Sequence, residues 1–395
     1  MPTYTLTDAA QEVWVESFAI RGRDLDPAPA ADWSVTKRTL RGGRREGVDL
    51  IEVDNGALAF SIVPTRGMGL WKGRYQGLDL GWKSPVNDGP VNPTFVNLMN
   101  WGGLGWLEGF DELLARCGLE NNGAPYTEGD ATFGLHGKIA NIPAHFVAVH
   151  AGEGPDGPIR VEGHVDESKI FSTQVRMATT VTTLPGANWL TVRDEFRNLS
   201  DLPQEMQILY HWNFGPPFLE EGSRFSAPAG QIVPRNARAV EGLGSLETYA
   251  GPEPGFAEQV YLYELLGEAG AGLGGQGASR TLTMLRNRAG GKAVVLRFDR
   301  AQLPAFTLWK NTGGLKSGYV TGLEPGTNYP NPKPFEKARQ RVVTLPPGGS
   351  YVTETTLEVL STAEQVADVE GEIERLRTQG TPVIHEAPVE PFTAP

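Results

Sequence analysis

The chain has 395 residues, of which 39% are hydrophobic and 21% charged, so it is long enough to bury a sizeable core. Its formal net charge is −12, which argues against a nucleic-acid or anionic-membrane partner. The single cysteine, Cys117, excludes an internal disulfide and a multi-cysteine metal site. Neither a signal peptide nor a long uncharged apolar run is visible, so we expect a cytoplasmic protein without membrane contact.

The distribution of turn residues predicts the fold class. The 49 glycines and 30 prolines are spread along the chain between short apolar runs. Many short strands separated by such residues are typical of an all-β protein, and we predict one large antiparallel β-sandwich with few short helices. We expect a single domain over 1–395, with an N-terminal arm or edge strands (1–45), the sandwich (46–360), and a C-terminal helix and proline-rich tail (361–395).

The first elements are a predicted short helix and a hairpin. The polar segment Thr7 to Glu12 favours a short helix. Two alternating runs, 48–54 and 57–63, flank an Asn-Gly turn and predict a hairpin. Arg66 follows the second run in a glycine-flanked loop. Its guanidinium could hold sugar hydroxyls through forked hydrogen bonds, but a surface arginine or a structural ion pair explains it equally well.

The segment 78–129 is the least regular part of the chain. It carries Trp82, Trp101 and Trp106 among repeated Gly and Asn residues. Tryptophans beside polar side chains suit a carbohydrate, whose ring faces stack on aromatics, although core packing is the more frequent role of any one tryptophan. Within this segment Glu108 to Ala115 favours a short helix that ends at Cys117-Gly118.

Two histidines stand next to predicted strands. His136 lies in the word Leu-His-Gly, and a lone histidine there is more often structural than catalytic. His211 follows an apolar strand that begins at Met206. Further strands are predicted at 146–149, 159–165, 173–183, 189–196, 281–285 and 293–298. The glycine-rich stretch 267–279 has no lysine and no strand–helix context, so we do not interpret it as a phosphate-binding loop.

The last third of the chain contributes one strand, one loop and one helix. A strand ends near Trp309 and Lys310, of which the lysine fits a partly exposed strand end as well as a ligand contact. The apolar approach 317–322 leads to Glu324, after which three prolines and a glycine argue against regular structure. A carboxylate at a strand end can be aimed at a substrate, although most surface acids have no chemical role. A terminal helix is predicted over Glu364 to Arg375.

Three of these sequence motifs resemble those of one known family. Gly-Leu-Glu324-Pro, followed by Leu-Pro-Pro-Gly at 345–348, is similar to the C-terminal signature of the aldose 1-epimerase (galactose mutarotase) superfamily. The His211 strand and the Leu-His136-Gly word are similar to its two histidine motifs, although Trp-Asn-Phe follows His211 in place of the family's order. The stretch 116–123 resembles a less studied branch. The resemblance implies a mutarotase-like supersandwich.

The resemblance also implies site residues and a reaction. Glu324 would be the catalytic base and His211 the general acid, and His136 and Arg66 would hold the sugar as hydrogen-bond donors. We add Asn121, Trp309 and Lys310 as candidate substrate-binding residues. The expected reaction interconverts the α and β anomers of a sugar by ring opening, without metal or organic cofactor.

Several alternatives remain open at this stage. A non-catalytic carbohydrate-binding protein, or a sugar isomerase or lyase on the same fold, would keep the same motifs. If Glu324 and His211 act on one anomeric carbon, we expect them to face one cleft with room for a sugar ring between them. We find no counterpart of the acidic residue that holds sugar hydroxyls in the galactose enzymes, so the sugar is undefined. A homodimer is left open.

Overall fold

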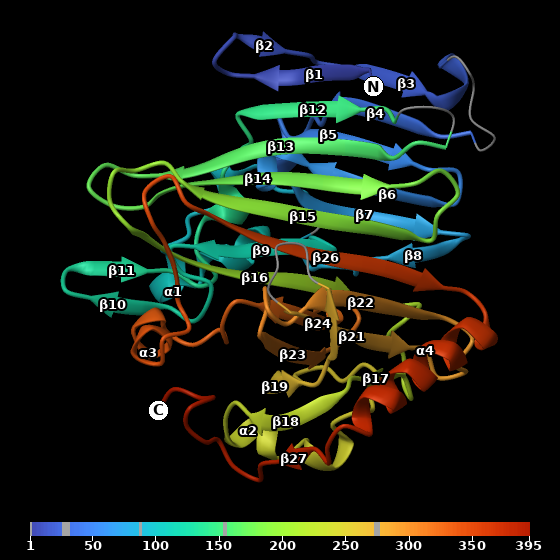
Figure 1. The fold of residues 1–395 in the computed structure, drawn as a ribbon, viewed down its shortest axis with the longest axis vertical. Coiled ribbons are helices and arrows are strands. Elements are labelled where there is room, and N and C mark those ends of the chain that lie inside the picture. Colours follow the sequence, from blue (N-terminus) through green and yellow to red (C-terminus); the bar gives the residue numbers. More distant parts are fainter. Residues whose placement is uncertain (1, 26–31, 87–88, 153–155, 272–276) are drawn as a thin grey trace.

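The computed structural model describes residues 2–25, 32–86, 89–152, 156–271 and 277–395. These residues form two large sheets packed face to face, which confirms the predicted all-β sandwich (Figure 1). The strands β12 to β15 of the first sheet lie in front of β5 to β7 of the second in Figure 1. Nearly all pairings between named strands are antiparallel, and β18 with β27 is a parallel exception.

The first sheet has 11 strands in the order β17-β21-β22-β26-β15-β14-β13-β12-β1-β2, with β20 beside β21. Their bounds are β1 Thr3–Asp8, β2 Val13–Trp14, β12 Phe146–His150, β13 Ile159–Ser168, β14 Gln174–Thr183, β15 Trp189–Asn198, β17 Arg224–Ser226, β20 Glu268–Ala271, β21 Gly277–Arg286, β22 Ala293–Asp299 and β26 Ser350–Leu360. Strands β13, β14 and β15 alternate buried and half-buried residues, because one face packs on the core and the other faces solvent.

The second sheet has 14 strands in the order β27-β18-β19-β23-β24-β16-β9-β7-β6-β5-β4-β3, with β25 beside β16 and β8 beside β7. Their bounds are β3 Phe18–Arg21, β4 Ser34–Thr39, β5 Asp49–Asp54, β6 Leu58–Val63, β7 Gly69–Tyr75, β8 Leu78–Leu80, β9 Leu114–Leu119, β16 Gln204–Phe214, β18 Ala229–Pro234, β19 Gln259–Leu265, β23 Ala305–Thr312, β24 Tyr319–Gly326, β25 Val343–Leu345 and β27 Val383–Ile384. A separate hairpin is formed by β10 Tyr126–Glu128 and β11 Ala131–Phe133. The predicted 48–63 hairpin is the β5–β6 pair.

Helices are few and short apart from one. The α-helices are α1 Asn100–Gly103, α2 Ala237–Val240, α3 Lys333–Ala338 and α4 Ala363–Arg377. The 3-10 turns are η1 Gly22–Asp24, η2 Gly43–Arg45, η3 Pro64–Arg66, η4 Pro93–Phe95, η5 Gly105–Gly109, η6 Ile139–Asn141 and η7 Leu243–Ser245. Helix α4 confirms the predicted terminal helix; Thr362 caps it, and its apolar side packs on Leu282 and Val295 of the first sheet.

The main core fills the space between the sheets. Val161 and Val192 of the first sheet meet Ile62 and Leu70 of the second in one continuous apolar cluster. A smaller cluster lies on the opposite, outer face of the second sheet, where Trp106 and Phe110 cover Ala115, Cys117 and Leu209. Strand β16 is therefore buried on both faces from Met206 to Phe214, unlike the strands of the first sheet.

Tertiary pairing overrides local propensity at three predicted elements. Thr7 to Glu12 is not a helix, because β1 runs through Asp8 and pairs with β12. Glu108 to Ala115 is not a helix either: η5 ends at Gly109, and β9 begins at Leu114 to pair with β16. Glu324 does not end its strand, since β24 continues through Pro325 to Gly326. An extended backbone accepts the φ of proline at the cost of one ladder hydrogen bond.

One predicted loop lies partly outside the described residues, and the C-terminal tail lies within them. The glycine-rich stretch 267–279 includes residues 272–276, which are outside the described residues. The C-terminal tail crosses the molecule: β27 pairs with β18, and Asn331 Nδ2 donates to the carbonyl of buried Phe392.

Candidate active site

The two predicted catalytic residues come from neighbouring strands of the second sheet. The β16–β24 register pairs Leu209 with Gly326 and Trp212 with Leu323, which places His211 opposite Glu324. Side chains alternate along a strand, so His211 points to the outer face while Tyr210 and Trp212 enter the core between the sheets. Two strands far apart in the sequence thus bring an imidazole and a carboxylate together.

The two side chains are in direct contact. His211 Nε2 lies 3.2 Å from Glu324 Oε1, and the side chains are only 6% and 3% exposed. Glu324 Oε1 has no hydrogen-bond partner among the described residues, so the short distance is not accompanied by good hydrogen-bond geometry. The expected room for a sugar ring between the two groups is absent. The pair is therefore open to a further molecule only from one side.

Gly322 provides the space in which the pair meets. A Cβ at this position would lie 2.3 Å from Glu324 Oε1 and 3.1 Å from His211 Cε1. Both distances are shorter than side-chain packing allows without a shift. Any larger residue at position 322 would therefore displace the carboxylate.

Burial moves the two pKa values in opposite directions. Loss of solvation raises the pKa of Glu324 well above its ordinary value, and nearby Glu258 adds to the increase. Loss of solvation also lowers the pKa of His211 well below 6.5, with His136 as a second cause. Both shifts favour a neutral pair, in which the carboxyl group carries one proton and Nε2 carries none. Since the groups are coupled, that proton belongs to the pair.

Asn213 fixes the orientation of the His211 ring. His211 Nδ1 lies 2.6 Å from Asn213 Oδ1, and Asn213 Nδ2 donates to the carbonyls of Glu112 and His211 itself at 3.0 and 2.8 Å. The two carbonyl partners identify the amide nitrogen, so Oδ1 is the acceptor and Nδ1 carries a proton. This leaves Nε2, which faces Glu324, as the nitrogen that can exchange a proton.

His136 lies beside the pair. Its ring centre is 5.5 Å from that of His211 in an edge-on arrangement. Nδ1 donates to the carbonyl of Asn122 at 2.9 Å, and loss of solvation lowers the pKa of the half-buried ring to about 4. Nε2 has no partner among the described residues. A neutral ring with Nδ1 protonated offers Nε2 as an acceptor, so the role expected from sequence, a donor to sugar, changes to an acceptor.

Three aromatic rings surround His211. The ring centres of Phe110, Trp309 and Trp106 lie 5.1, 5.4 and 6.0 Å from its own. Trp106 and Phe110 are buried, whereas Trp309 is half-buried, so this group of rings extends to the surface. Trp309 Nε1 donates to Glu258 at 2.7 Å. Such rings present flat apolar faces beside the imidazole and the carboxylate.

Lys310 does not join this site. Trp309 pairs with Gly322 across β23 and β24, and the next residue, Lys310, points to the opposite face. There its ammonium donates to the carbonyls of Ser245, Leu246 and Thr248, at 2.8, 3.2 and 2.7 Å. Burial lowers the pKa of Lys310 to about 8. The lysine organises the 245–248 turn, and the prediction of a ligand contact is corrected.

Arg66 is also committed to structure. Its side chain is buried, and its Nη2 lies 2.6 Å from Glu112 Oε1 in a buried ion pair. Nη1 donates to Asn141, and Nη2 also donates to the carbonyl of Gly109 at 3.1 Å. This setting matches the ion-pair interpretation of Arg66 and not that of a sugar-holding donor. Arg66 supports the Gly109 turn, next to Phe110.

Asn121 has a similar supporting position. It is buried, and its Nδ2 donates to the carbonyls of Gly123, Ala124 and Gly134 at 3.3, 3.3 and 2.8 Å. These bonds join the 121–124 turn to the loop that carries His136. The structure thus brings His211, Glu324, His136 and Trp309 together, whereas Arg66, Asn121 and Lys310 stand outside the cluster.

The residues missed from sequence are Asn213, Phe110, Asn122 and Gly322, whereas Trp106 is one of the three tryptophans that the sequence suggested for stacking on a carbohydrate. Asn213 could have been found, because residues two apart on a strand share a face. The same rule applies to Gly322, which lies two residues before Glu324 on β24. The others come from loops whose approach depends on the tertiary fold.

The described part of the chain shows no metal centre. Among the described residues, no group of three or more His, Cys, Asp or Glu side chains is arranged to hold a metal ion. Cys117 is buried near Glu324, and loss of solvation raises the pKa of its thiol well above the ordinary value.

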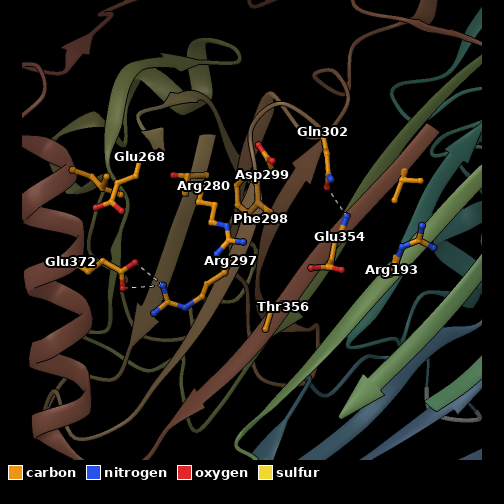
Figure 2. A pocket seen from close by; sticks show the side chains of 13 residues that line it. Arg193, Glu268, Arg280, Arg297, Phe298, Asp299, Gln302, Glu354, Thr356 and Glu372 are labelled. Carbon is orange, nitrogen blue, oxygen red and sulfur yellow. Dashed lines mark hydrogen bonds and ion pairs between the residues drawn. The ribbon is translucent and has the colours of Figure 1, made fainter. Parts of the chain in front are cut away.

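A second hollow lies away from this cluster. This cavity lies on the outer face of the first sheet and has a volume of about 520 Å³. Figure 2 shows the side chains that line it, beside α4. Arg297 is paired there with Glu372 at 2.7 Å, and Gln302 accepts from the Glu354 backbone at 3.0 Å. None of the residues predicted from sequence lines it, and it contains no histidine, so we place the candidate active site at His211 and Glu324.

Comparisons with known proteins agree with the fold. The family model described as "Domain of unknown function (DUF4432)" matches residues 45–359. A crystal structure from Klebsiella pneumoniae, of a protein provisionally named an aldose 1-epimerase, is 37% identical with a TM-score of 0.93, covering 98% of this chain and 99% of that one. A galactose mutarotase-like protein from Clostridium acetobutylicum is 16% identical with a TM-score of 0.53, covering 82% and 98%.

A galactose 1-epimerase from Lactobacillus acidophilus is 12% identical with a TM-score of 0.50, covering 88% of this chain and 99% of that one, which is a likeness of fold alone. The search of curated proteins gave no match. The chain therefore belongs to the DUF4432 family, a divergent branch of the aldose 1-epimerase (galactose mutarotase)-like superfamily. In the part of the chain that the structure describes, we find no helix of the length and apolarity needed to cross a membrane.

Proposed function

We propose that this protein is an aldose 1-epimerase-like enzyme that interconverts the α and β anomers of a sugar. The observation that carries the proposal is the buried contact of Glu324 with His211, in which Oε1 has no hydrogen-bond partner among the described residues. A buried carboxylate oxygen without a partner is costly and needs an explanation, and a substrate hydroxyl would supply one.

The reaction needs one proton on the pair. With the proton on His211 Nε2, the imidazolium gives it to the ring oxygen of the sugar while Glu324 removes the proton of the anomeric hydroxyl. The bond from the anomeric carbon to the ring oxygen breaks, and an open-chain carbonyl forms. After rotation of that carbonyl the two transfers reverse and the ring closes as the other anomer.

The contact distance is compatible with this chemistry. The ring oxygen and the anomeric oxygen are bonded to the same carbon, so two adjoining groups can reach both from one side. Half-buried His136 and Trp309 mark the side from which the sugar would enter. His136 Nε2 would accept from a sugar hydroxyl, and Trp309 would pack against the ring.

Asn213 and the aromatic residues Trp106 and Phe110 have supporting roles in this proposal. The Asn213 amide holds Nδ1 protonated, which keeps Nε2 available to the substrate. Trp106 and Phe110 exclude water from the pair, which strengthens each electrostatic interaction inside the site.

The test is saturation-transfer NMR of anomer exchange with the purified protein across a panel of free aldoses and closely related sugars. We expect exchange well above the spontaneous rate for at least one sugar. Binding without faster exchange would indicate a sugar-binding protein, and conversion to a different constitution would indicate an isomerase or lyase.

A further inference from the structure

The place of His136 is set by the turn 121–124. The backbone N–H of His136 donates to the carbonyl of Gly123 at 2.9 Å, and its ring Nδ1 donates to the carbonyl of Asn122 at 2.9 Å. His136 has φ of +59°, a left-handed conformation that the surrounding structure must hold in place. The histidine thus depends on two carbonyls of one turn, one for its backbone and one for its ring.

The loop 327–332 holds this turn from the other side. It follows directly after β24, the strand that carries Glu324. The backbone N–H of Ala124 donates to the carbonyl of Pro330 at 3.1 Å. At Gly123 the two backbones are so close that a Cβ would lie 2.2 Å from the carbonyl oxygen of Asn331. Only glycine fits at this contact, so the turn and the loop are packed together as one unit.

A pair of asparagine side chains joins the turn to the loop. Asn328 Nδ2 donates to Asn122 Oδ1 at 3.0 Å, and Asn122 Nδ2 donates to Asn328 Oδ1 at 3.2 Å. Both residues are buried, although they lie 206 positions apart in the sequence. A reciprocal pair of this kind fixes both the distance and the angle between two segments, because each amide plane must match the other.

The Asn328 amide is itself fixed by its own loop. Its Nδ2 also donates to the carbonyl of the next residue at 2.7 Å, and its Oδ1 also accepts from the Thr327 hydroxyl at 3.0 Å. Thr327 is tied to β16, because its backbone N–H donates to the carbonyl of Ile208 at 2.9 Å. Strand β16 carries His211. A path of hydrogen bonds therefore leads from the strands of the candidate catalytic pair to the ring of His136.

We propose that Asn122 and Asn328 are positioning residues for His136. Their amide pair holds the His136 ring in a fixed place beside the candidate catalytic pair, and neither of them touches the reacting atoms. They act through the Asn122 carbonyl, which keeps ring Nδ1 protonated and leaves Nε2 free to accept. The use of Nε2 as an acceptor for a sugar hydroxyl rests on the proposed function, whereas the hydrogen-bond path to the ring does not.

The first measurement is the tautomer of His136, by NMR of protein with isotope-labelled histidine. At pH 7 the ring is neutral, because its pKa is about 4. The signals of His136 are identified by their loss in His136→Gln. In the wild type we expect the proton on Nδ1. Asn328→Ala, and Asn122→Ala as a second variant on the other side of the pair, should give a mixture with protonated Nε2, because the Asn122 carbonyl no longer selects one nitrogen.

The second measurement is the concentration dependence of anomer exchange. Asn328→Ala should raise KM by about tenfold, as expected for the loss of one hydrogen bond to the substrate. It should change kcat less, because the contact of Glu324 with His211 is untouched. His136→Gln should have the same effect. Adding Asn328→Ala to His136→Gln should cause no further loss, since both changes remove the same interaction.

The matched control is Asn55→Ala. Asn55 is also buried, and its Nδ2 donates to the carbonyls of Leu184 and Ala187 at 2.9 and 3.1 Å, which join the β5–β6 turn to the first sheet. Its loss should lower stability and leave the tautomer of His136 and KM at their wild-type values.

An unchanged tautomer of His136 in both Asn122→Ala and Asn328→Ala would overturn the inference. A change of the same size in Asn55→Ala would overturn it too, because it would show a general loosening of the fold. If the wild type gives no anomer exchange, the proposed function fails, and the tautomer measurement alone still supports or overturns the role of the asparagine pair.

Discussion

The two faces of the second sheet hold buried charge in different ways. On the inner face, Arg116 of β9 bridges to Asp194 of the first sheet through bonds of 2.6 and 3.0 Å, and Tyr210 donates to the same carboxylate at 2.7 Å. On the outer face, one residue along β16 from Tyr210, His211 meets Glu324 with one carboxylate oxygen left without a hydrogen bond.

The difference separates a structural from a chemical role. The Arg116–Asp194 pair joins the two sheets and satisfies its charges inside the protein, as burial requires. The Glu324–His211 pair keeps part of its hydrogen-bonding capacity free at a place that half-buried residues border. We infer that the fully paired Arg116–Asp194 contact supports the fold, and that the Glu324–His211 contact, with one carboxylate oxygen unpaired beside an imidazole, is where a ligand is expected.

The largest predicted effect is on the outer face. Glu324→Gln should reduce anomer exchange by about a hundred- to ten-thousand-fold, because the amide keeps the shape but cannot take the proton. The fold should remain intact by circular dichroism. Glu354→Gln, which changes a half-buried carboxylate on the first sheet, is the matched control and should exchange at the wild-type rate. Equal activity of wild type and Glu324→Gln would remove Glu324 as the base.

A substitution on the inner face should lower the stability of the fold and leave the rate of anomer exchange unchanged. Arg116→Met leaves Asp194 buried without its cation and should lower the free energy of unfolding by about 3–5 kcal/mol. Urea denaturation measures this change. The exchange rate per folded molecule should stay near that of the wild type. An unchanged stability with lost activity would reverse the roles assigned to the two faces.

The pH–rate profile should follow the protons of the pair. Activity requires one shared proton, so it should fall when a second proton is added in acid and when the shared proton leaves in alkali. The lowered pKa of His211 places the acid limb below 6.5, and the raised pKa of Glu324 places the alkaline limb above 4.5. An acid limb at or above pH 6.5 would contradict the one-proton state.

A smaller effect concerns His136 and stability in acid. Its pKa is about 4 in the folded protein and about 6.5 when unfolded, so the unfolded chain binds the proton first. Its contribution is fully present above pH 6.5 and is lost as the pH falls to about 4. His136→Gln should therefore lose less stability than the wild type between pH 7 and 5 in urea denaturation. An equal or larger loss in the variant would show that His136 is not held neutral.

Much of the fold was accessible from sequence, because it depends on local patterns. The alternating runs 159–165 and 189–196 predicted β13 and β15, and the Asn-Gly turn predicted the β5–β6 hairpin. The helix predicted over Glu108 to Ala115 was wrong for a physical reason. The local pattern suits a helix, but pairing with β16 makes β9 a strand. Strand partners distant in sequence are invisible to a local pattern.

The residues of the candidate site could also be predicted from the sequence only in part. The family motifs predicted His211, Glu324 and His136, whose side chains the fold brings together. The choice of both Trp309 and Lys310 ignored alternation along β23, by which only one of two neighbours can face the site. The Asn213 contact required the same rule, whereas the approach of Trp106 and Phe110 depends on a loop that only the tertiary structure defines.

The central claim is that Glu324 and His211 act as one proton-sharing unit, and a double-mutant cycle tests it most directly. Anomer exchange is measured by saturation-transfer NMR on the best sugar for wild type, Glu324→Gln, His211→Asn and the double variant. We predict a loss of about a hundredfold or more in each single variant. The double variant should be about as slow as the slower single one. A double loss equal to the product of the two single losses would show independent groups, and a wild-type rate in either single variant would contradict the account.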